Sequence, residues 1–346
     1  MAPTMHAIVK PSAAPGAAYQ EVPVPEIGLR DVLVKVHTAS ICGTDLHICD
    51  WDAWSQSRIH PPLVFGHEFC GHIARLGGEV EGLKEGELVS ADMHVFCGHC
   101  YQCRSGEAHI CQNVKILGVD GPGCFAEYVR IPAANIVPLG AGISTDYGAI
   151  LDPLGNAVHT VLAGPVAGRS VAVIGCGPIG LMAIAVARAC GAGPVLASEI
   201  NANRRGLAQA MGADVVLDPA RDNVAERARA LTPGGGVDAA LEFSGHPEGI
   251  RTAFQAARPG GRVSLLGIPS RAVELDLTRD IIFKGLTVEG INGRRLFDTW
   301  HQMIGLLRQK RLALEPLFTD RLPLRDFAQG VERLRQGKAA KVLLTP

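Results

Sequence analysis

From about residue 151 onward, short apolar runs alternate with longer segments of helical character. Val171–Ile174 and Val195–Ser198 are runs of strand length, and the apolar segment Ile179–Ala189 between them is long enough for a helix. The same patterns predict a helix at Leu207–Met211 and strands at Asp214–Leu217, Ala239–Phe243, Arg262–Leu266 and Leu286–Gly290. Repeated strand–helix units predict an α/β domain in which helices cover both faces of a parallel sheet.

The first 150 residues have a pattern typical of β-rich structure with long loops. Val32–His37 alternates apolar and polar side chains, as a half-buried strand does. Proline and glycine pairs such as Pro61-Pro62 and Gly77-Gly78 then interrupt the chain. This region therefore predicts a second domain of a different class.

The last residues are expected to complete the first domain. Their pattern predicts a helix near Trp300–Arg308 and a closing strand at Lys341–Leu344. We predict a discontinuous β-rich domain formed by residues 1–150 and 298–346, and a doubly wound Rossmann domain formed by residues 151–297.

Length and composition fit a two-domain protein that acts on a small molecule. The chain has 346 residues, of which 47% are hydrophobic and 19% charged, so both domains can bury a core. The formal net charge of -1 gives no general field that would attract nucleic acid or an anionic membrane surface. We therefore expect neither as a partner.

Neither export nor membrane insertion is indicated. The N-terminal segment lacks the charged start, apolar core and cleavage site of a signal peptide. Val171–Ala187 carries no charge, but Gly175, Gly177, Pro178 and Gly180 divide it into a strand, a turn and a helix start. We expect a cytoplasmic protein, whose ten cysteines are more consistent with metal sites and buried thiols than with a disulfide framework.

A glycine-rich turn predicts a dinucleotide site. Gly175, Gly177 and Gly180 form a G-x-G-x-x-G pattern that directly follows the strand Val171–Ile174 and opens the next helix. The first glycine makes the tight turn, the second lets the backbone approach a pyrophosphate, and the third allows close packing of helix on strand. The helix N-terminus then favours the anionic pyrophosphate.

An acidic residue indicates which dinucleotide is bound. Glu199 lies 19 residues after Gly180, at the end of the next apolar strand. A carboxylate there accepts hydrogen bonds from ribose hydroxyls and repels a 2′-phosphate, which predicts NAD rather than NADP. Arg204 and Arg205 follow closely, and basic residues near this position can instead accommodate that phosphate.

Four cysteines within 15 residues predict a metal site. Cys97, Cys100, Cys103 and Cys111 have the short spacings with which a tight loop surrounds a tetrahedral zinc ion. An iron–sulfur cluster is the main alternative, because C-x2-C-x2-C also opens a ferredoxin motif. The spacing to the fourth cysteine departs from that motif, so structural zinc is the preferred interpretation.

A second set of residues could hold a catalytic zinc ion. Such a site needs three protein ligands and one open position. Cys42 and His67, 25 residues apart, can supply a thiolate and an imidazole. Glu68 and Asp152 are both candidates for the third ligand, and the spacing alone does not choose between them.

At these residues the chain resembles the zinc-containing medium-chain alcohol dehydrogenases, over essentially its whole length. The most specific stretches are ICGTDLH (41–47), WDAWSQ (51–56), FGHE (65–68), GCFAEY (123–128), DPLGNAVHT (152–160) and GPIG (177–180). WDAWSQ and DPLGNAVHT are most similar to the family members that oxidise L-threonine.

The resemblance implies a fold and a set of functional residues. The fold is a GroES-like catalytic domain plus a Rossmann domain, assembled as a homotetramer with NAD and two zinc ions per subunit, one catalytic and one structural. The implied catalytic zinc ligands are Cys42, His67 and Glu68, and the structural ones are the four cysteines. Thr44 and His47 match a proton relay, and Asp152 matches a carboxylate close to the zinc. The implied NAD contacts are Ile179, Glu199, Arg204, Leu266, Gly267, Ile268, Ile291 and Asn292.

The implied activity is oxidation of the secondary hydroxyl group of L-threonine to 2-amino-3-oxobutanoate, with NAD+ as hydride acceptor, in threonine catabolism. Oxidation of a polyol or of butanediol by the same residues is the first alternative. A non-catalytic scaffold is expected to have lost Cys42, His67 or the glycine pattern, and all are present. A nucleic-acid binder built on the four-cysteine loop is disfavoured, because apart from two histidines residues 97–111 contain only one basic residue, Arg104.

Overall fold

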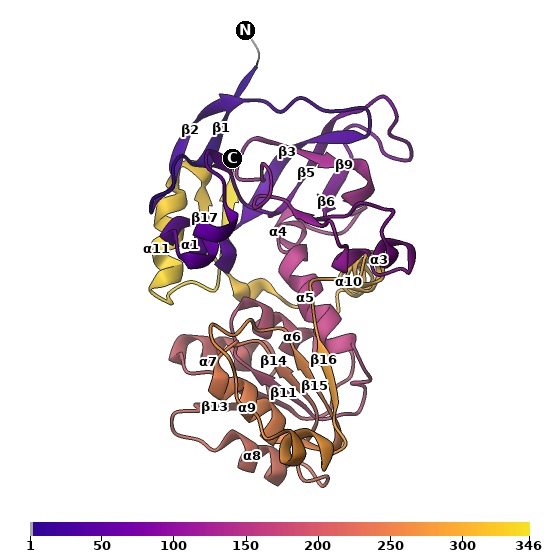
Figure 1. The fold of residues 1–346 in the computed structure, drawn as a ribbon, viewed down its shortest axis with the longest axis vertical. Helices are drawn as coiled ribbons and strands as arrows, with labels where there is room; N and C mark the ends of the chain where they lie inside the picture. The colour runs from indigo at the N-terminus through magenta and orange to yellow at the C-terminus, as the bar shows by residue number, and fades with distance from the viewer. Residues whose placement is uncertain (1–2) are drawn as a thin grey trace. The chain divides into compact units, whose positions relative to one another are not determined.

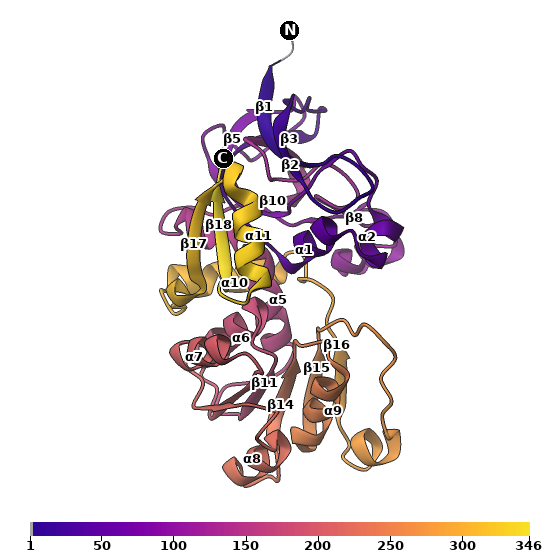
Figure 2. The same ribbon diagram turned by 90° about the vertical axis from the view of Figure 1, so that its left-hand side faces the viewer.

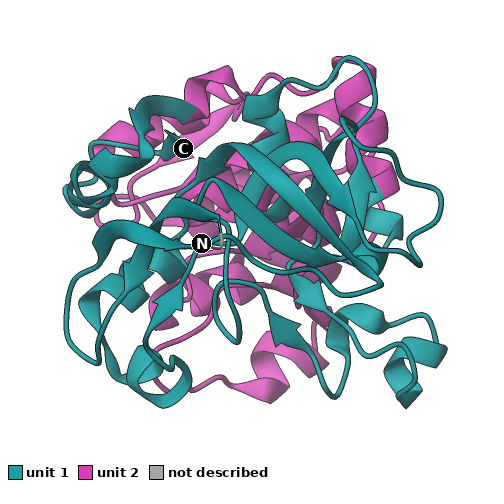
Figure 3. Cartoon of the chain, turned by 90° about the horizontal axis from the view of Figure 1, so that it is seen from above, with its two compact units in different colours: residues 1–152, 295–300, 318–346 teal, residues 153–294, 301–317 magenta. Residues whose placement is uncertain are grey.

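The structure is a computed structural model that describes residues 3–346. The chain divides into two compact units, drawn in different colours in Figure 3. Unit 1 comprises residues 1–152, 295–300 and 318–346, and unit 2 comprises residues 153–294 and 301–317.

Unit 1 is built on a mostly antiparallel sheet with the strand order β10-β6-β5-β3-β18-β17, in which β9 also pairs with β3. These strands are β3 (Asp31–Ser40), β5 (Glu68–Leu76), β6 (Leu88–Ala91), β9 (Tyr128–Pro132), β10 (Ile136–Pro138), β17 (Phe318–Pro323) and β18 (Lys341–Thr345). A smaller sheet joins β1 (Thr4–Lys10), β2 (Ala18–Pro23) and β4 (Leu63–Val64), and a ribbon joins β7 (His94–Val95) and β8 (Lys115–Ile116). The helices of unit 1 are α1 (Gly43–Asp50), α2 (Ala53–Arg58), α3 (Tyr101–Arg104), α4 (Thr145–Ala149) and α11 (Phe327–Arg335).

The C-terminal segment completes the sheet of unit 1. β18 lies antiparallel to β3, with Leu343 opposite Ser40, and β17 lies parallel to β18. Figure 2 shows α11 beside these two strands. As a result Lys341, the first residue of β18, is placed next to the end of β3.

An aromatic cluster forms the centre of the core of unit 1. The rings of Phe65, Phe125 and Phe327 pack against one another with centroids 5.3–5.6 Å apart. Gly66 follows with a φ of +90°, and a Cβ atom there would lie 2.5 Å from the ring of Phe125. Glycine is therefore required at Gly66. The cluster fixes the chain immediately before His67.

Unit 2, drawn in Figure 1, contains a six-stranded, wholly parallel sheet with the order β13-β12-β11-β14-β15-β16. Its strands are β11 (Val171–Ile174), β12 (Val195–Ser198), β13 (Val215–Leu217), β14 (Val237–Glu242), β15 (Ala257–Leu265) and β16 (Thr287–Gly290). Helices α6 (Pro178–Ala189) and α7 (Ala202–Ala210) pack on one face, and α8 (Val224–Leu231) and α9 (Pro247–Ala256) on the other. The predicted doubly wound parallel sheet is confirmed.

Two details differ from the sequence-based expectation. Helix α7 begins at Ala202, five residues before the predicted start, because the side chain of Asn201 caps it by accepting a hydrogen bond from the backbone N–H of Arg204 at 3.1 Å. The segment 301–317 lies in unit 2 and not in the β-rich domain. Within this segment Arg311 donates a hydrogen bond to the carbonyl of Ala189 at the end of α6.

Helices α5 (Leu151–Leu162) and α10 (Asp298–Arg308) each contain a boundary between the units. The chain passes from unit 1 to unit 2 after Asp152 and again after Trp300. Asp152 itself belongs to unit 1, as do Cys42, His67 and Glu68.

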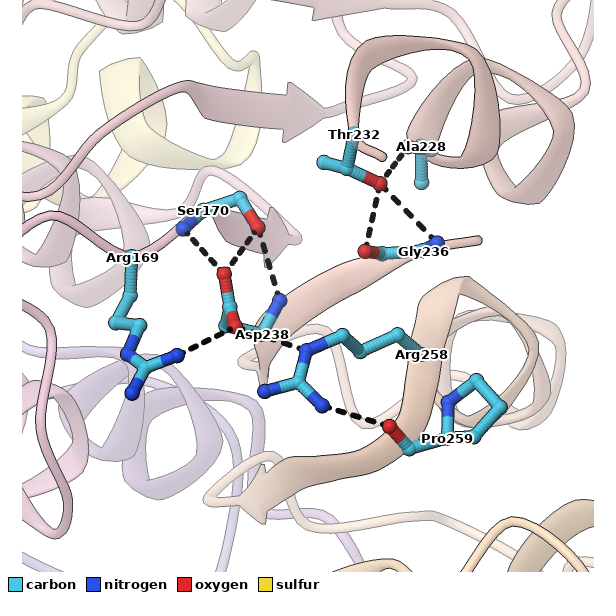
Figure 4. A network of polar contacts seen from close by, with 8 residues as sticks. All are labelled: Arg169, Ser170, Ala228, Thr232, Gly236, Asp238, Arg258 and Pro259. Carbon is cyan, nitrogen blue, oxygen red and sulfur yellow. Dashed lines mark hydrogen bonds and ion pairs between the residues drawn. The ribbon is translucent and has the colours of Figure 1, made fainter. Parts of the chain in front are cut away.

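A polar network in unit 2 ties together the amino-terminal ends of β11, β14 and β15 (Figure 4). The carboxylate of Asp238 accepts hydrogen bonds from the backbone N–H and hydroxyl of Ser170, at 2.9 and 2.7 Å, and from the guanidinium of Arg258 at 2.8 Å. Burial alone would raise the pKa of Asp238, but these hydrogen bonds and the charge on Arg258 lower it to about 2.

Asp238→Asn should lower the free energy of unfolding of the protein by about 1–2 kcal/mol at pH 7, because hydrogen bonds to a charged acceptor are lost. Since the pKa of Asp238 is lower in the folded than in the unfolded state, this contribution is fully present above about pH 4 and disappears as the pH falls towards 2. Urea unfolding of both proteins across this pH range measures it. A difference that stays constant down to pH 2 would mean that the ionised carboxylate is not the source of the stability.

Candidate active site and metal centres

The four-cysteine loop brings its sulfur atoms together. It runs from β7 through α3 and the short 3-10 turn Ala108–Ile110 to β8. The sulfur atoms of Cys97, Cys100, Cys103 and Cys111 all lie within 4.8 Å of one another. Cys100 Sγ is 3.5 Å from that of Cys103 and 3.7 Å from that of Cys111. Four thiolates in a tetrahedron around zinc, each about 2.3 Å from the metal, have sulfur–sulfur distances of about 3.8 Å, so the loop fits zinc.

The loop also supports negative charge on its sulfur atoms. The backbone N–H of His99 lowers the pKa of Cys97 to about 5, and that of Cys103 lowers the pKa of Cys100. Burial and the neighbouring Cys100 instead raise the pKa of Cys103 to about 12. Several thiolates held this closely require a cation among them, and a metal ion supplies that charge.

The second cluster consists of Cys42, His67 and Glu68. Their ligand atoms all lie within 4.8 Å of one another. Cys42 is the N-cap residue of α1, His67 follows the aromatic cluster, and Glu68 is the first residue of β5. His67 and Glu68 are buried, whereas Cys42 is half-buried. The cluster therefore combines a thiol, an imidazole and a carboxyl group, with one side reachable from outside.

This donor set fits a zinc ion of the catalytic type. Among residues 3–346, Glu68 Oε1 is buried without a hydrogen-bond partner, which is costly unless a ligand is bound. Burial lowers the pKa of His67, but the negative charges of Cys42, Asp45 and Asp152 raise it to about 10. The surroundings thus stabilise a positive charge at His67, and a divalent cation would provide one without a proton.

Glu68 is held in place by a buried lysine. Lys341 Nζ forms an ion pair with Glu68 Oε2, and the hydroxyl of Ser40 donates a hydrogen bond to the same oxygen. The side chains of Lys341 and Glu68 are 2% and 0% exposed. Lys341 also donates to the carbonyl of Ile41 at 2.9 Å. Oε2 is therefore occupied, while Oε1 remains available to a metal.

Other predicted catalytic residues lie around this cluster. Thr44 and His47 are three residues apart on α1 and so project from similar directions. The hydroxyl of Thr44 is 3.9 Å from Cys42 Sγ. Asp152 is buried at the start of α5 and its charge raises the pKa of His67, but it is not among the three residues whose ligand atoms cluster. The geometry favours Glu68 over Asp152 as the third ligand.

A buried carboxylate anchors the start of α1. Asp45 Oδ2 accepts a hydrogen bond from the backbone N–H of Cys42 at 2.8 Å, and its side chain is fully buried. Burial raises the pKa of Asp45 to about 6. The contact fixes the N-cap from which the thiol of Cys42 projects.

The glycine pattern in unit 2 has the predicted local geometry. Gly175 has a φ of +89° at the end of β11, and Gly177 is the N-cap residue of α6 with no atom within 4 Å of a Cβ placed on it. A Cβ on Gly180 would lie 2.0 Å from the carbonyl oxygen of Gly175. The three glycines thus make the turn, leave space above the helix N-terminus and permit close packing, and Ile179 follows in the first turn of α6.

Glu199 projects back towards the glycine turn. Its carboxylate accepts hydrogen bonds from the backbone N–H groups of Cys176 at 2.7 Å and Asn201 at 2.9 Å. Arg205 is engaged elsewhere, with the carbonyls of Glu199 and Ile200 and with the carboxylate of Asp218 at 3.2 Å. Arg204 is half-buried in the first turns of α7.

The remaining predicted cofactor residues follow the carboxyl ends of β15 and β16. Leu266, Gly267 and Ile268 come directly after β15, and Ile268 is 91% exposed. Ile291 and Asn292 follow β16, and the backbone N–H of Ile291 bonds to the carbonyl of Leu265. Open α/β sheets bind ligands at this edge.

Sequence reasoning missed two buried charged residues that organise these sites. Glu242, at the carboxyl end of β14, accepts hydrogen bonds from the backbone N–H groups of Ser244 and Gly245 and so shapes a turn beside Gly267. The sequence pattern predicts that Lys341 lies in a strand, but it does not indicate the ion pair that its side chain forms. In the sequence, Glu242 and Lys341 each stand as a charged residue at one end of an apolar strand. That position predicts that the side chain is buried against an oppositely charged or polar partner, but it does not identify the partner.

The chain matches two family models. Residues 28–141 match an alcohol dehydrogenase GroES-like domain, and residues 178–309 match a zinc-binding dehydrogenase. The L-threonine 3-dehydrogenases of Bacillus licheniformis and Symbiobacterium thermophilum are 50% and 49% identical to it, over 99% and 100% of this chain and 99% of each relative.

A solved structure described as a zinc-binding dehydrogenase, from Sinorhizobium meliloti 1021 and bound to NADP, superposes with a TM-score of 0.91. It is 31% identical, over 99% of this chain and 100% of that one. The chain therefore belongs to the zinc-binding alcohol dehydrogenase family. The predicted combination of a GroES-like domain and a Rossmann domain is confirmed.

Within residues 3–346, every helix is too short or too polar to cross a bilayer.

Lys341→Met should destabilise the protein by about 3–5 kcal/mol, because it leaves the buried Glu68 carboxylate without its cationic partner. The loss should be larger after zinc removal, since Glu68 then lacks both cations. Lys338→Met makes the same chemical change at an exposed position of the same segment and serves as the control. Thermal unfolding of all three proteins, with and without a chelator, measures the effect. Equal unfolding temperatures for the two variants would contradict a buried ion pair at Glu68.

Proposed function

We propose that this chain is an L-threonine 3-dehydrogenase, which oxidises the secondary hydroxyl group of L-threonine to 2-amino-3-oxobutanoate with NAD+. The observation that carries the proposal is the cluster of Cys42, His67 and Glu68, which has the donor set of a catalytic zinc site. The sequence identity of about half to relatives with this activity, over their whole length, supports the choice of substrate.

Two bound groups supply the chemistry that side chains lack. Zinc held by Cys42, His67 and Glu68 provides a Lewis acid that lowers the pKa of an alcohol hydroxyl, and the nicotinamide provides a hydride acceptor. The four-cysteine loop holds the second, structural zinc ion. The glycine turn would hold the pyrophosphate of the cofactor and Glu199 its ribose, and the other residues proposed to contact NAD are Ile179, Arg204, Leu266, Gly267, Ile268, Ile291 and Asn292.

The chain's own residues move the proton that leaves the hydroxyl group. Thr44 lies beside Cys42, where its hydroxyl group would accept that proton and pass one on. His47 receives it, directly or through the cofactor ribose, since both residues project from similar directions on α1. The His47 side chain is 61% exposed and can release the proton to water.

Two carboxylates complete the active site. Glu68, held at Oε2 by Lys341, offers Oε1 as a metal ligand. Asp152, buried near His67, would stabilise the positive charge of a metal bound there.

NAD is proposed as the cofactor because the carboxylate of Glu199 lies at the glycine turn. A second negative charge at the ribose 2′ position would be repelled there. Of the two arginines that could instead accommodate a 2′-phosphate, Arg205 is already paired with Asp218 and two backbone carbonyls, whereas Arg204 is half-buried in the first turns of α7. The cytoplasmic location and the homotetramer stay predictions.

Zinc-replete protein should form NADH with a much larger kcat/KM for L-threonine than for 2,3-butanediol or sorbitol, and should prefer NAD+ to NADP+. Cys42→Ser should reduce turnover of L-threonine by at least about 100-fold while the zinc of the four-cysteine loop is retained. Initial rates and zinc content by mass spectrometry measure both. Faster oxidation of a diol would reassign the substrate, and absence of turnover with every alcohol would favour a scaffold.

A further inference from the structure

The segment Trp51–Gln56 (WDAWSQ) is the part of the sequence that the proposed mechanism leaves unexplained. It joins the end of α1 to α2, and Asp52 is the N-cap residue of α2. It also lies directly against His47, the last residue of the proposed relay.

The two carboxylate oxygens of Asp52 contact different groups. Oδ1 accepts a hydrogen bond from the backbone N–H of Ser55 at 3.0 Å, which caps α2. Oδ2 lies 2.6 Å from His47 Nδ1. The N–H of Ser55 and the contact with His47 lower the pKa of Asp52, so the group is ionised near neutral pH.

This contact determines where the proton of the imidazole sits. An ionised carboxylate can only accept hydrogen bonds, so the short contact requires a proton on His47 Nδ1. In neutral imidazole the other nitrogen, Nε2, is then the one without a proton. His47 is thereby prepared to accept a proton at Nε2 alone.

The other residues of the segment support the same arrangement. The hydroxyl of Ser55 donates to the backbone carbonyl of His47 at 2.7 Å, and the ring of Trp54 lies edge-on to the imidazole with centroids 6.2 Å apart. Gln56 donates to the carbonyl of Trp51 at 2.8 Å, and the buried ammonium of Lys10 lies 4.9 Å from the centre of the Trp51 ring. The His47 backbone and ring are thus both held by this segment.

We propose that Asp52 is a positioning residue of the proton relay, which fixes the Nδ1–H tautomer of His47 so that Nε2 accepts the substrate-derived proton. The proposal rests on the proposed function, since it assigns His47 the role of final proton acceptor. The segment WDAWSQ would then position His47 for proton transfer as well as connect α1 to α2.

A purely structural role for Asp52, as a helix cap, makes a different prediction. Asparagine and serine cap helices about as well as aspartate, so Asp52→Asn and Asp52→Ser both keep the cap. Asparagine has only one oxygen, which the N–H of Ser55 would use, and its NH2 group would then face His47 Nδ1. Because NH2 is a donor, Nδ1 must become an acceptor and the proton moves to Nε2. Serine leaves no group facing His47.

The tautomer can be measured without any turnover. In protein labelled with 15N-histidine, two-bond 15N–1H correlation spectra distinguish Nδ1–H from Nε2–H imidazole, and the His47→Gln spectrum identifies the His47 signals among the 12 histidines. Wild-type protein should show the Nδ1–H form of His47, Asp52→Asn the Nε2–H form, and Asp52→Ser a mixture. An Nε2–H form in the wild type would overturn the proposal.

Steady-state rates with L-threonine and NAD+ then test the consequence. Asp52→Asn should lower kcat by about tenfold to 100-fold, at or below the lower end of what a positioned base contributes, because water can partly replace an exposed histidine. The KM for L-threonine should change less than about twofold, and Asp52→Ser should lose less activity than Asp52→Asn. No loss in either variant would mean that Asp52 acts only as a cap, and equal losses in both would contradict an effect through the tautomer of His47.

A double-variant comparison shows whether Asp52 acts through His47. If it does, Asp52→Asn adds no further loss of kcat in the His47→Gln background. A full additional loss there would contradict the proposal. Should the protein fail to oxidise L-threonine at all, the proposed function fails, and the NMR result still decides whether Asp52 controls the tautomer.

Discussion

The buried charge at the junction of β3, β5 and β18 is the constraint on which the rest of unit 1 depends. A thiol, an imidazole and a carboxylate meet there, and removing ionised groups from water costs several kcal/mol for each ion. This free-energy cost is offset only if cations lie next to the buried negative charges. The chain supplies one of them, Lys341, and the donor set calls for a second in the form of a metal ion.

This requirement explains why the C-terminal strand returns to the sheet of unit 1. The hydrogen bond from Lys341 to Ile41 joins residues 300 positions apart, and the ion pair with Glu68 joins residues 273 positions apart. The same strand forms backbone pairs with β3 and covers the aromatic cluster. The same strand, β18, therefore both completes the sheet and supplies the positive charge that pairs with Glu68.

Helix α1 connects this site to the two residues proposed as a proton relay. Its N-cap residue is Cys42, its first turns carry Thr44, and His47 lies one turn further on, where Asp52 begins the next helix. The short helix α1 thus sets the spacing between Cys42 and the proposed relay residues Thr44 and His47. In unit 2 the glycine turn and Glu199 meet the separate requirements of a dinucleotide, which are met by backbone N–H groups and one carboxylate.

How much of this could be read from the sequence depends on how local each feature is. The glycine turn, the four-cysteine loop and most strands of unit 2 were predicted with accurate bounds, because neighbouring residues determine them. Spacing alone did not choose between Glu68 and Asp152 as the third ligand; the family resemblance implied Glu68, and in the fold its ligand atom lies with those of Cys42 and His67. The roles of Lys341 and Asp52 could not be predicted, because each depends on a partner that only the folded chain brings close. The early start of α7 was missed because its first turn has few apolar residues and is set by the Asn201 cap.

The most direct test of the buried charge at Cys42, His67 and Glu68 is to locate zinc itself. Crystals of the purified chain, measured on both sides of the zinc absorption edge, give an anomalous difference map that shows where the metal lies. We expect two peaks per chain, one among the four cysteines and one in contact with Cys42, His67 and Glu68. A single peak at the four-cysteine loop, in protein prepared with excess zinc, would contradict this expectation, because the buried donors would then be stable without a metal.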